Sequence, residues 1–310
     1  MKKVVVTGGA GFIGSHLAEK LADDYEVSII DNLSTGRVGN INSITSKGNV
    51  IITRGNILEL PLLNRLFQGA DYVFHLAAVT SVPLSIRDPE NTTVVNIQGT
   101  LNVLLAAREQ GIKKVIYASS SSVYGDTPTL PKVENMTPNP QSPYAVSKLT
   151  GEYYCRVFQL VYGLPTVCLR YFNVYGPRQD PNPQYAAVIP KFITRITSSQ
   201  GPVIFGDGEQ SRDFTYVKDV VEANILAAES EATGIFNIGT GEKVTINQLA
   251  KLCIEMLSNY RVNPIHEEPR KGDIRDSLAD ITAAKNFGYC PKYDLEKGLH
   301  ETIRSFTSEA

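Results

Sequence analysis

The feature that most constrains the fold lies near the start of the chain, where an apolar run is followed by closely spaced glycines. Val4–Thr7 read as a short strand, and Gly8, Gly11 and Gly14 follow with a spacing of three residues. Glycine permits a tight turn and a close approach of the backbone to a pyrophosphate, and the helix N-terminus beyond it offers free N–H groups. A glycine-rich turn without a ligand has the same composition, but the place between a predicted strand and a predicted helix favours a dinucleotide-binding loop.

Short β-branched apolar runs alternate with helical patterns through the first half of the chain. We predict strands at Val4–Thr7, Glu26–Asp31, Val50–Arg54, Asp71–Ala77, Lys114–Ser119 and Thr166–Tyr171. We predict helices at Ile13–Ala22, Leu60–Phe67, Pro89–Gln110 and Pro143–Tyr162. Strands this apolar are typical of strands buried on both faces, and the alternation indicates an α/β fold with a parallel, doubly wound Rossmann sheet.

The pattern changes after Pro177, where polar, proline-rich and glycine-rich segments appear at Gln179–Gln184 and Ser198–Asp213. We predict three further helices and one strand in this part, at Lys218–Ala228, Ile246–Leu257, Leu295–Phe306 and Ile235–Ile238. We therefore expect residues 1–177 to form the Rossmann domain, with an interleaved segment near 214–242. Residues 178–310 are expected to form a smaller α/β region that binds substrate and closes over the carboxyl edge of the sheet.

Charge and hydropathy exclude several classes of partner. Lys and Arg number 30 and Asp and Glu number 32, so the net charge is −2. This balance argues against a broad basic surface for nucleic acid or an anionic membrane. No stretch approaches the roughly 18 apolar residues of a membrane span, and the first apolar run is too short for a signal peptide. We expect a cytoplasmic protein with neither nucleic acid nor membrane as a partner.

The cysteines and histidines are scattered along the chain. Cys155, Cys168, Cys253 and Cys290 form no CxxC pair, and no histidine lies at metal-ligand spacing from them. The pattern predicts buried thiols in a reducing compartment and no metal site.

Asp31 ends the second predicted strand, which is the place of the carboxylate that accepts hydrogen bonds from the adenosine ribose. A carboxylate there repels a 2′-phosphate, and no arginine follows before Arg37. An aspartate in a strand-end turn is the alternative interpretation. Next to the glycine motif, Asp31 favours NAD over NADP.

Tyr144 and Lys148 lie four residues apart in a predicted helix, so their side chains share one face. A cation beside a phenol favours the phenolate, which predicts a lowered pKa for Tyr144 and a role as acid and base for a hydroxyl. An exposed helix pair would show the same spacing. The hydroxyl-rich run Ser119–Ser122 strengthens the catalytic interpretation, because it follows a predicted strand at the edge where α/β sheets bind ligands.

Together these motifs resemble the extended short-chain dehydrogenase/reductases and, within that family, the nucleotide-sugar epimerases. The ordered set comprises Gly8–Gly14, Asp31, His75–Ala78, Asn96, Ser119–Gly125, Tyr144 with Lys148, Arg170–Asn173, Ser211–Phe214, Asn237–Gly241 and Gly272–Asp273.

The resemblance implies a UDP-hexose 4-epimerase with NAD as a bound cofactor, in which C4 is oxidised to a 4-keto sugar and reduced from its opposite face. Ser120, Tyr144 and Lys148 match the family's catalytic positions, and Lys148 would also hold the nicotinamide ribose. The matching cofactor positions are Gly8, Gly11, Phe12, Ile13, Gly14, Asp31, Asn32, Asn56, Ile57, Leu76, Ala77, Ala78, Asn96, Tyr144 and Lys148. Asn56 departs from the family's usual aspartate facing adenine, but its side-chain carbonyl can still accept a hydrogen bond.

The resemblance also implies a nucleotide-sugar site. Asn173, Arg212 and Arg270 match positions for the substrate pyrophosphate, Arg275 is a further candidate, and Val188 and Phe205 match positions around the uracil. A solvated arginine or an ordinary core residue is the alternative at each position. The remaining expected substrate contacts are Ser81, Ser121, Ser122, Ala187 and Ser277.

Ser277 stands where family members restricted to glucose and galactose carry a bulky tyrosine, so we expect room for a 2-acetamido group. Ser81 and the segment Tyr185–Pro190 also resemble members that act on UDP-N-acetylhexosamines. We therefore expect UDP-GlcNAc and UDP-GalNAc to be accepted beside UDP-glucose and UDP-galactose.

Several alternatives remain open. A UDP-glucuronate decarboxylase, another family member acting on a nucleotide sugar, or a reductase would use the same scaffold, and a non-catalytic NAD-sensing module would share the fold. A 4,6-dehydratase is disfavoured, because Ser121 and Ser122 replace the Asp-Glu pair that eliminates water. The family also implies a homodimer that pairs the helices at Pro89–Gln110 and Pro143–Tyr162.

Overall fold

The computed structural model describes residues 1–180, 187–257, 261–269 and 274–308. At its centre lies a seven-stranded sheet with the order β3-β2-β1-β4-β5-β6-β9, in which all neighbours are parallel. The strands are β1 (Lys2–Thr7), β2 (Tyr25–Asp31), β3 (Val50–Arg54), β4 (Tyr72–His75), β5 (Lys114–Ser120), β6 (Thr166–Tyr171) and β9 (Gly234–Ile238). The strand order reverses between β1 and β4, and open α/β sheets bind ligands outside the carboxyl ends of the strands at such a point.

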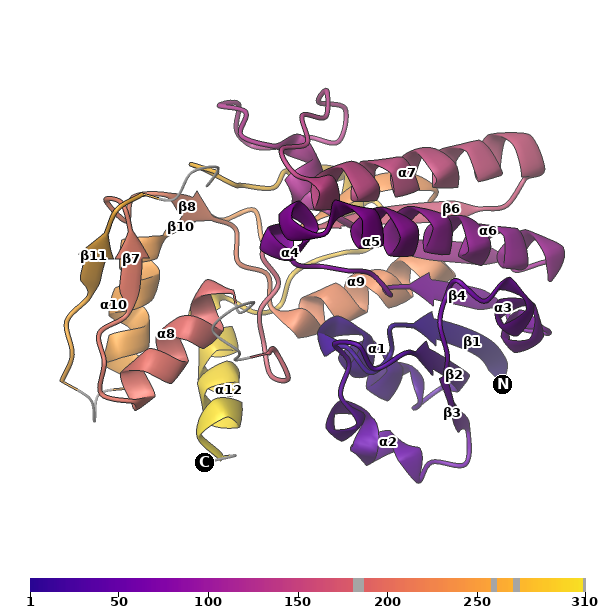
Figure 1. Cartoon of the computed structure of the whole chain (residues 1–310), viewed down its shortest axis with the longest axis horizontal. Coiled ribbons are helices and arrows are strands. Elements are labelled where there is room, and N and C mark those ends of the chain that lie inside the picture. Colours follow the sequence, from indigo (N-terminus) through magenta and orange to yellow (C-terminus); the bar gives the residue numbers. More distant parts are fainter. Residues whose placement is uncertain (181–186, 258–260, 270–273, 309–310) are drawn as a thin grey trace.

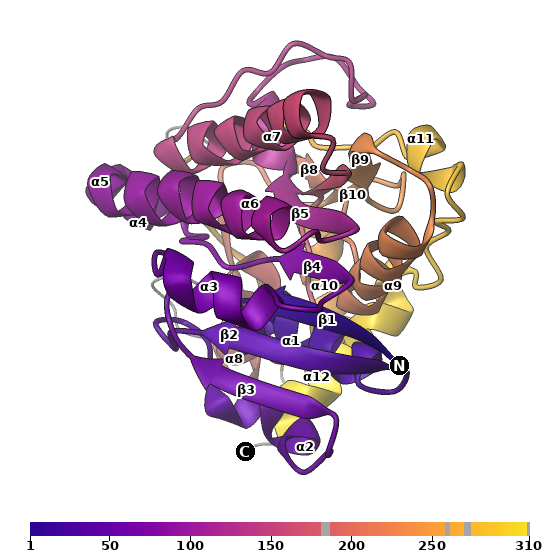
Figure 2. The ribbon, with the colours of Figure 1, turned by 90° about the vertical axis from the view of Figure 1, so that its right-hand side faces the viewer.

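Helices cover both faces of this sheet (Figures 1 and 2). One face carries α1 (Phe12–Leu21) and α9 (Val217–Glu229), and the other carries α3 (Leu60–Phe67), α6 (Gly99–Glu109) and α7 (Pro143–Tyr162). Shorter elements connect them, namely a 3₁₀ turn at Val38–Ile41, α2 (Asn42–Thr45), α4 (Val82–Arg87), α5 (Pro89–Thr93), a π-helical turn at Val94–Gln98 and a 3₁₀ turn at Ser121–Tyr124. The architecture confirms the predicted doubly wound α/β fold.

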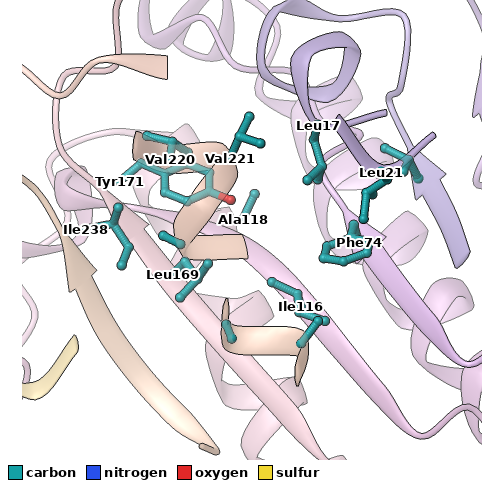
Figure 3. Close-up of a cluster of buried hydrophobic side chains, with 14 of the residues drawn as sticks. Leu17, Leu21, Phe74, Ile116, Ala118, Leu169, Tyr171, Val220, Val221 and Ile238 are labelled. Atoms are coloured by element: carbon teal, nitrogen blue, oxygen red, sulfur yellow. The ribbon is translucent and has the colours of Figure 1, made fainter. Parts of the chain in front are cut away.

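The strands are apolar along their whole length because each face of the sheet has its own core. Val4 and Val6 of β1 point to the core under α1 and α9, whereas Val5 points to the core under α3, α6 and α7. Figure 3 shows the first core, in which Leu17 of α1 and Val220 of α9 lie on the same side of the sheet. Each fully buried aliphatic side chain contributes roughly 1.5–3 kcal/mol relative to an exposed one, which makes these two layers the main source of stability.

The C-terminal part of the chain has a third core. Its helices are α8 (Val188–Thr197), α10 (Ile246–Met256) and α12 (Leu295–Ser308). The short helix α11 (Thr282–Lys285) instead packs against β9, and its Ala284 belongs to the first core. Figure 1 shows the helices α8, α10 and α12 gathered beside the large sheet. Two small sheets accompany them: β7 (Val203–Phe205) pairs with β11 (Ile265–Glu267), and β8 (Ser211–Arg212) pairs with β10 (Val244–Thr245). Between these elements the chain returns to the large sheet, where α9 packs on β5 and β6 and β9 pairs with β6.

The structure corrects several expectations at the level of elements. The polar segment 198–213 contains β7 and β8, and the sequence interpretation missed the helices α4 and α8. The signal for α8 was present, because Ile189, Phe192, Ile193 and Ile196 recur at helical spacing and are all buried. The prediction of buried thiols is wrong for Cys290, which is exposed, while the other three cysteines are buried.

Candidate active site

The glycine loop turns tightly over the carboxyl end of β1. Gly8 has a φ of +73°, and a Cβ there would lie 2.8 Å from the Cα of Ala77. A Cβ on Gly14 would lie 2.1 Å from the carbonyl oxygen of Gly8. Gly11 precedes α1 with no side-chain cap. Gly8 and Gly14 therefore allow backbone segments to approach more closely than a side chain would permit. The positive end of the α1 dipole faces the carboxyl edge of the sheet.

Asp31 lies beside this loop at the end of β2. Its buried carboxylate accepts the N–H of Ala10 at 2.9 Å and the N–H of Leu33 at 2.8 Å. A Cβ on Gly36 would lie 2.8 Å from one carboxylate oxygen, so the glycine preserves space there. Each oxygen keeps a further lone pair for a ribose hydroxyl. Arg37 instead pairs with Asp180 at 2.6 Å.

A chain of buried hydrogen bonds joins the end of β1 to α6 behind the loop. The Nδ1 of His75 lies 2.8 Å from the hydroxyl of Thr7, and its Nε2 lies 2.9 Å from the hydroxyl of Thr100. Thr100 donates its proton to the carbonyl oxygen of Asn96 at 2.6 Å, so it must accept from Nε2–H. His75 is therefore neutral with its proton on Nε2, and burial lowers its pKa to about 3.

Asn96 connects this series of hydrogen bonds to α7. Its side-chain oxygen accepts the N–H of Val79 at 2.7 Å, and its amide donates to the carbonyl of Val79 at 3.0 Å and to the hydroxyl of Ser147 at 2.9 Å. Ser147 in turn donates to the carbonyl oxygen of Tyr144 at 2.8 Å. The side-chain bonds of Asn96 thus hold the loop after β4 against the first turn of α7. Whether Asn96 also contacts the cofactor stays a prediction.

The ends of α7 follow from local sequence. Ser142 accepts the N–H of Ala145 at 3.1 Å, Pro143 occupies the first helical position, and Gly163 ends the helix in a left-handed conformation. This start places Tyr144 in the first turn and Lys148 one turn later, next to the carboxyl end of β5. Lys148 donates from Nζ to the carbonyl oxygen of Ala118 at 2.7 Å. The Nζ lies 5.9 Å from the ring centroid of Tyr144.

The electrostatics of this pair differ from the expectation. Burial raises the pKa of Tyr144, and a hydrogen bond with Ser120 only partly offsets this. Burial also lowers the pKa of Lys148 to about 8. The prediction of a lowered pKa for Tyr144 is therefore wrong for this structure, because desolvation of the phenolate outweighs the hydrogen bond with Ser120.

The serine run Ser119–Ser122 lies at the carboxyl end of β5, as predicted. Ser120 ends β5, accepts the N–H of Ser122 at 3.2 Å and hydrogen bonds with Tyr144. Ser121 is partly buried, and the hydroxyl of Ser122 is buried without a hydrogen-bond partner among the described residues. A buried hydroxyl without a partner is costly, which suits a ligand oxygen at this position.

Sequence analysis missed a buried ion pair next to these groups. Glu152 of α7 binds Arg170 of β6 through two hydrogen bonds of 2.8 and 2.7 Å. Ser119 donates to the same carboxylate at 2.5 Å. A signal was available, because Arg170 is the one charged residue in an otherwise apolar predicted strand and Glu152 is four residues beyond Lys148.

The predicted substrate residues lie on the C-terminal part and on the loops that face it. Asn173 donates to the carbonyl of Asp213 at 3.3 Å, and Arg212 donates to the carbonyl of Ser211 at 2.8 Å. Ser277 is buried and donates its N–H to the carbonyl of Ser211 at 3.1 Å, so residues 211, 212 and 277 lie together. Arg275 is exposed and pairs with Asp207. This placement is compatible with both interpretations of Arg275, a solvated surface charge and a ligand-binding residue.

The remaining predicted positions are dispersed around this edge. Ala187 precedes α8 and Val188 begins it, Phe205 ends β7, and Ser81 caps α4 by accepting the N–H of Leu84 at 3.2 Å. Arg270 lies outside the described residues, as do Tyr185, Gly272 and Asp273.

The remaining predicted cofactor positions lie after the strands β2, β3 and β4 and at the start of α1. Asn56 accepts the N–H of Leu58 at 3.0 Å, so one lone pair of its side-chain carbonyl is already used, and Ile57 is buried beside it. Asn32 is exposed after Asp31, and its side-chain oxygen accepts the N–H of Ser34 at 3.0 Å. Phe12, Ile13, Leu76, Ala77 and Ala78 are all partly buried.

This arrangement fits a dinucleotide. The loop has space that a Cβ at Gly8 or Gly14 would fill, the N-terminus of α1 lacks a side-chain cap, and Asp31 stands at the next strand end. Among the described residues, no group of three or more His, Cys, Asp or Glu side chains is placed to hold a metal ion. No helix in the described part of the chain is long and apolar enough to cross a membrane.

Known proteins resemble the chain over nearly its full length. The putative UDP-glucose 4-epimerase of Methanocaldococcus jannaschii is 40% identical over 302 residues, 97% of each chain. The UDP-N-acetyl-alpha-D-glucosaminuronate decarboxylase of Bacillus cytotoxicus is 37% identical over 319 residues, which are 98% of this chain and 98% of that protein. The solved UDP-N-acetylglucosamine 4-epimerase of Methanobrevibacter ruminantium, in complex with UDP-N-acetylmuramic acid, is 46% identical with a TM-score of 0.96 and covers 100% of this chain and 99% of that one.

The family match agrees with the geometry of the glycine loop and of the strand ends. The NAD dependent epimerase/dehydratase family matches residues 4–239, which include Asp31, Ser120, Tyr144 and Lys148. This match confirms the resemblance inferred from the motifs and the prediction of NAD as the cofactor. The chain belongs to the NAD dependent epimerase/dehydratase family.

Proposed function

We propose that the protein is a UDP-hexose 4-epimerase, which inverts C4 of a UDP-linked sugar through a transient 4-keto sugar. The observation that carries the proposal is the hydrogen-bonded pair Ser120 and Tyr144 at the end of β5, with Lys148 buried beside it. The similarity to named 4-epimerases over nearly the whole chain supports the same conclusion.

In this proposal the chain's own residues move the proton. Tyr144 takes the proton of the C4 hydroxyl on its phenolic oxygen and later returns it. Ser120 donates a hydrogen bond that stabilises the phenolate oxygen. The buried ammonium of Lys148, 5.9 Å from the ring centroid of Tyr144, would add a positive charge near it. When bound, NAD supplies the acceptor and donor of the C4 hydride. The loop Gly8–Gly14 and Asp31 would hold it.

We assign the two ends of the substrate to different parts of the chain. Residues 1–177, with the segment near 214–242, hold the cofactor, and residues 178–310 bind the nucleotide. Arg212, Arg270 and Asn173 would bind the pyrophosphate, since guanidinium and amide donors suit phosphate oxygens. Ser277 is small and lies beside Ser211, which supports a pocket that admits a 2-acetamido group.

Decarboxylation of a UDP-uronate is the second candidate, and the similarity to a decarboxylase favours keeping it. We also propose a homodimer and a cytoplasmic location. The dimer is supported by exposed apolar side chains along α7, and the location by four cysteines that are free.

The test is to incubate the purified protein separately with UDP-glucose, UDP-GlcNAc and UDP-glucuronate and to resolve the products. We expect the C4 epimers of the first two sugars. Loss of CO₂ from UDP-glucuronate without epimer formation would establish the decarboxylase instead. A folded protein that binds NAD but converts none of the three would support the sensing module.

A further inference from the structure

The ion pair between Glu152 and Arg170 differs from the other ion pairs of the described residues in its burial. Its side chains are 0% and 2% exposed, whereas each of the others has at least one partner exposed by a third or more. Both carboxylate oxygens of Glu152 accept from the guanidinium, and one also accepts from Ser119. The stability of a fold seldom requires such a pair, because its desolvation is costly.

With Ser119, the ion pair joins three elements next to Ser120 and Tyr144, namely α7, β6 and β5. Glu152 lies on α7, Arg170 on β6, and Ser119 on β5 directly before Ser120. Arg170 also donates to the carbonyl of Glu134 at 3.3 Å, and its guanidinium lies 4.6 Å from the ring centroid of Tyr124. The carboxylate of Glu152 therefore fixes the end of β5 against the helix that carries Tyr144.

Cys155 and Glu152 of α7 both raise the pKa of Lys148 against the effect of burial, and Glu152 is the carboxylate of the two. Glu152 and Lys148 are four positions apart on α7 and share one buried face. The titratable groups around Lys148 are Tyr117 of β5, His75 of β4, and Tyr144, Glu152 and Cys155 of α7, with Arg170 of β6 behind Glu152. His75 is neutral, and Glu152 is the carboxylate among these groups. Burial lowers the pKa of Lys148, and the negative charge of Glu152 raises it.

We infer that Glu152 is a positioning residue of the active site: it aligns the end of β5 through Ser119 and Arg170, and its charge keeps Lys148 protonated. The inference rests on the proposed roles of Tyr144 and Lys148. It assigns Glu152 no contact with substrate or cofactor.

The first test measures Lys148 directly, with no need for turnover. In the NAD-loaded protein labelled with ¹³C at lysine Cε, the signal of Lys148 is assigned by its loss in Lys148→Arg and titrated with pH. We expect Glu152→Gln to lower the pKa of Lys148 by about 1 unit. The alkaline limb of the kcat profile should move to lower pH by the same amount. Glu222→Gln, which removes the exposed partner of Lys292, is the matched control and should leave both unchanged.

A second variant guards against misfolding of Glu152→Gln, which leaves Arg170 as a buried charge without its partner. Glu152→Gln/Arg170→Met removes both charges, and the pKa of Lys148 should still lie below the wild-type value. If Glu152→Gln or the double variant folds and the pKa of Lys148 is unchanged in it, the electrostatic role of Glu152 is overturned. If Glu152→Gln shifts the Lys148 titration but the wild-type protein epimerises no sugar, the proposed function is refuted and the electrostatic role of Glu152 stands.

Ser119→Ala tests alignment separately, because it keeps the charge of Glu152. We expect an unchanged Lys148 titration with a loss in kcat of about 10-fold or more and a KM near the wild-type value. A wild-type kcat in Ser119→Ala would overturn the alignment role.

Discussion

At Tyr144 and Lys148, burial acts on two ionisable groups in opposite directions. It raises the pKa of the phenol and lowers that of the ammonium to about 8, so each group is pushed toward its neutral form. The hydrogen bond with Ser120 counteracts this effect at Tyr144, and Cys155 and Glu152 counteract it at Lys148. The chemistry proposed for Tyr144 therefore depends on Ser120 of another element as well as on neighbours along α7.

Tyr144→Phe removes the hydroxyl and keeps the ring. We expect turnover of UDP-glucose to fall by at least about 100-fold, the lower range for removal of a general acid–base. Steady-state kinetics and a folding check by circular dichroism measure this. Near-full activity in a folded variant would contradict the assignment of Tyr144.

Ser277→Tyr fills the space that we propose for the 2-acetamido group. Overpacking a well-packed site costs about 1–3 kcal/mol, or roughly 5- to 150-fold in discrimination. We expect a large loss of kcat/KM for the UDP-GlcNAc/UDP-GalNAc pair and a small loss for the UDP-glucose/UDP-galactose pair. Comparing both pairs in wild type and variant separates this effect from general damage. Equal losses would mean that Ser277 does not line the C2 wall.

Among the elements, the predicted helix Pro89–Gln110 shows how tertiary contacts alter local structure. It forms as α5 and α6 with a π-helical turn between them, at Val94–Gln98. Asn96 lies in that turn, where its side chain bonds both Val79 and Ser147. Such turns are frequent at functional sites because the wider turn redirects a side chain. Periodicity alone predicts only a continuous helix.

The N-cap of α7 gives a prediction at the scale of the element. Ser142→Ala should lower the free energy of unfolding by about 1 kcal/mol, the usual effect of losing a serine cap. Since Tyr144 lies in the capped turn, we also expect kcat to fall. The matched control is Thr245→Ala, which removes the cap of α10. Urea unfolding and kinetics of both variants test this, and an equal effect on kcat in both would argue against a specific role of the α7 cap.

For the whole molecule, two buried histidines predict how stability depends on pH. Burial lowers the pKa of His75 to about 3 and that of His16 to about 4, against about 6.5 in the unfolded chain. The unfolded state therefore binds more protons in this range, and stability falls as the pH drops from 6.5 toward 4. Each histidine should contribute a slope of about 1.4 kcal/mol per pH unit. Urea unfolding between pH 7 and pH 5 should show a smaller slope in His16→Gln and in His75→Gln, and an unchanged slope would contradict this.

The surface of α7 predicts how two copies of the chain associate. Val157 is 45% exposed and Leu160 is 72% exposed, and Val146, Tyr153 and Val161 are also exposed on this helix. Val157→Glu/Leu160→Glu should convert a dimer into a monomer, as measured by light scattering, because it places charge in a contact between apolar surfaces. Ile51→Glu on β3 is the matched control and should leave the dimer intact. A wild-type monomer at micromolar concentration would contradict the proposed dimer.

The sequence by itself determined the sheet, the glycine loop and the pairing of Tyr144 with Lys148, because apolar periodicity, glycine spacing and an i, i+4 interval are local properties. Only the tertiary structure showed the carboxylate of Glu152 between Arg170 and Ser119, since these residues come from three separate elements. Only burial reversed the expected direction of the Tyr144 pKa, because desolvation depends on every neighbour that excludes water. Local sequence patterns thus predict the positions of Tyr144 and Lys148, whereas tertiary packing determines their pKa values.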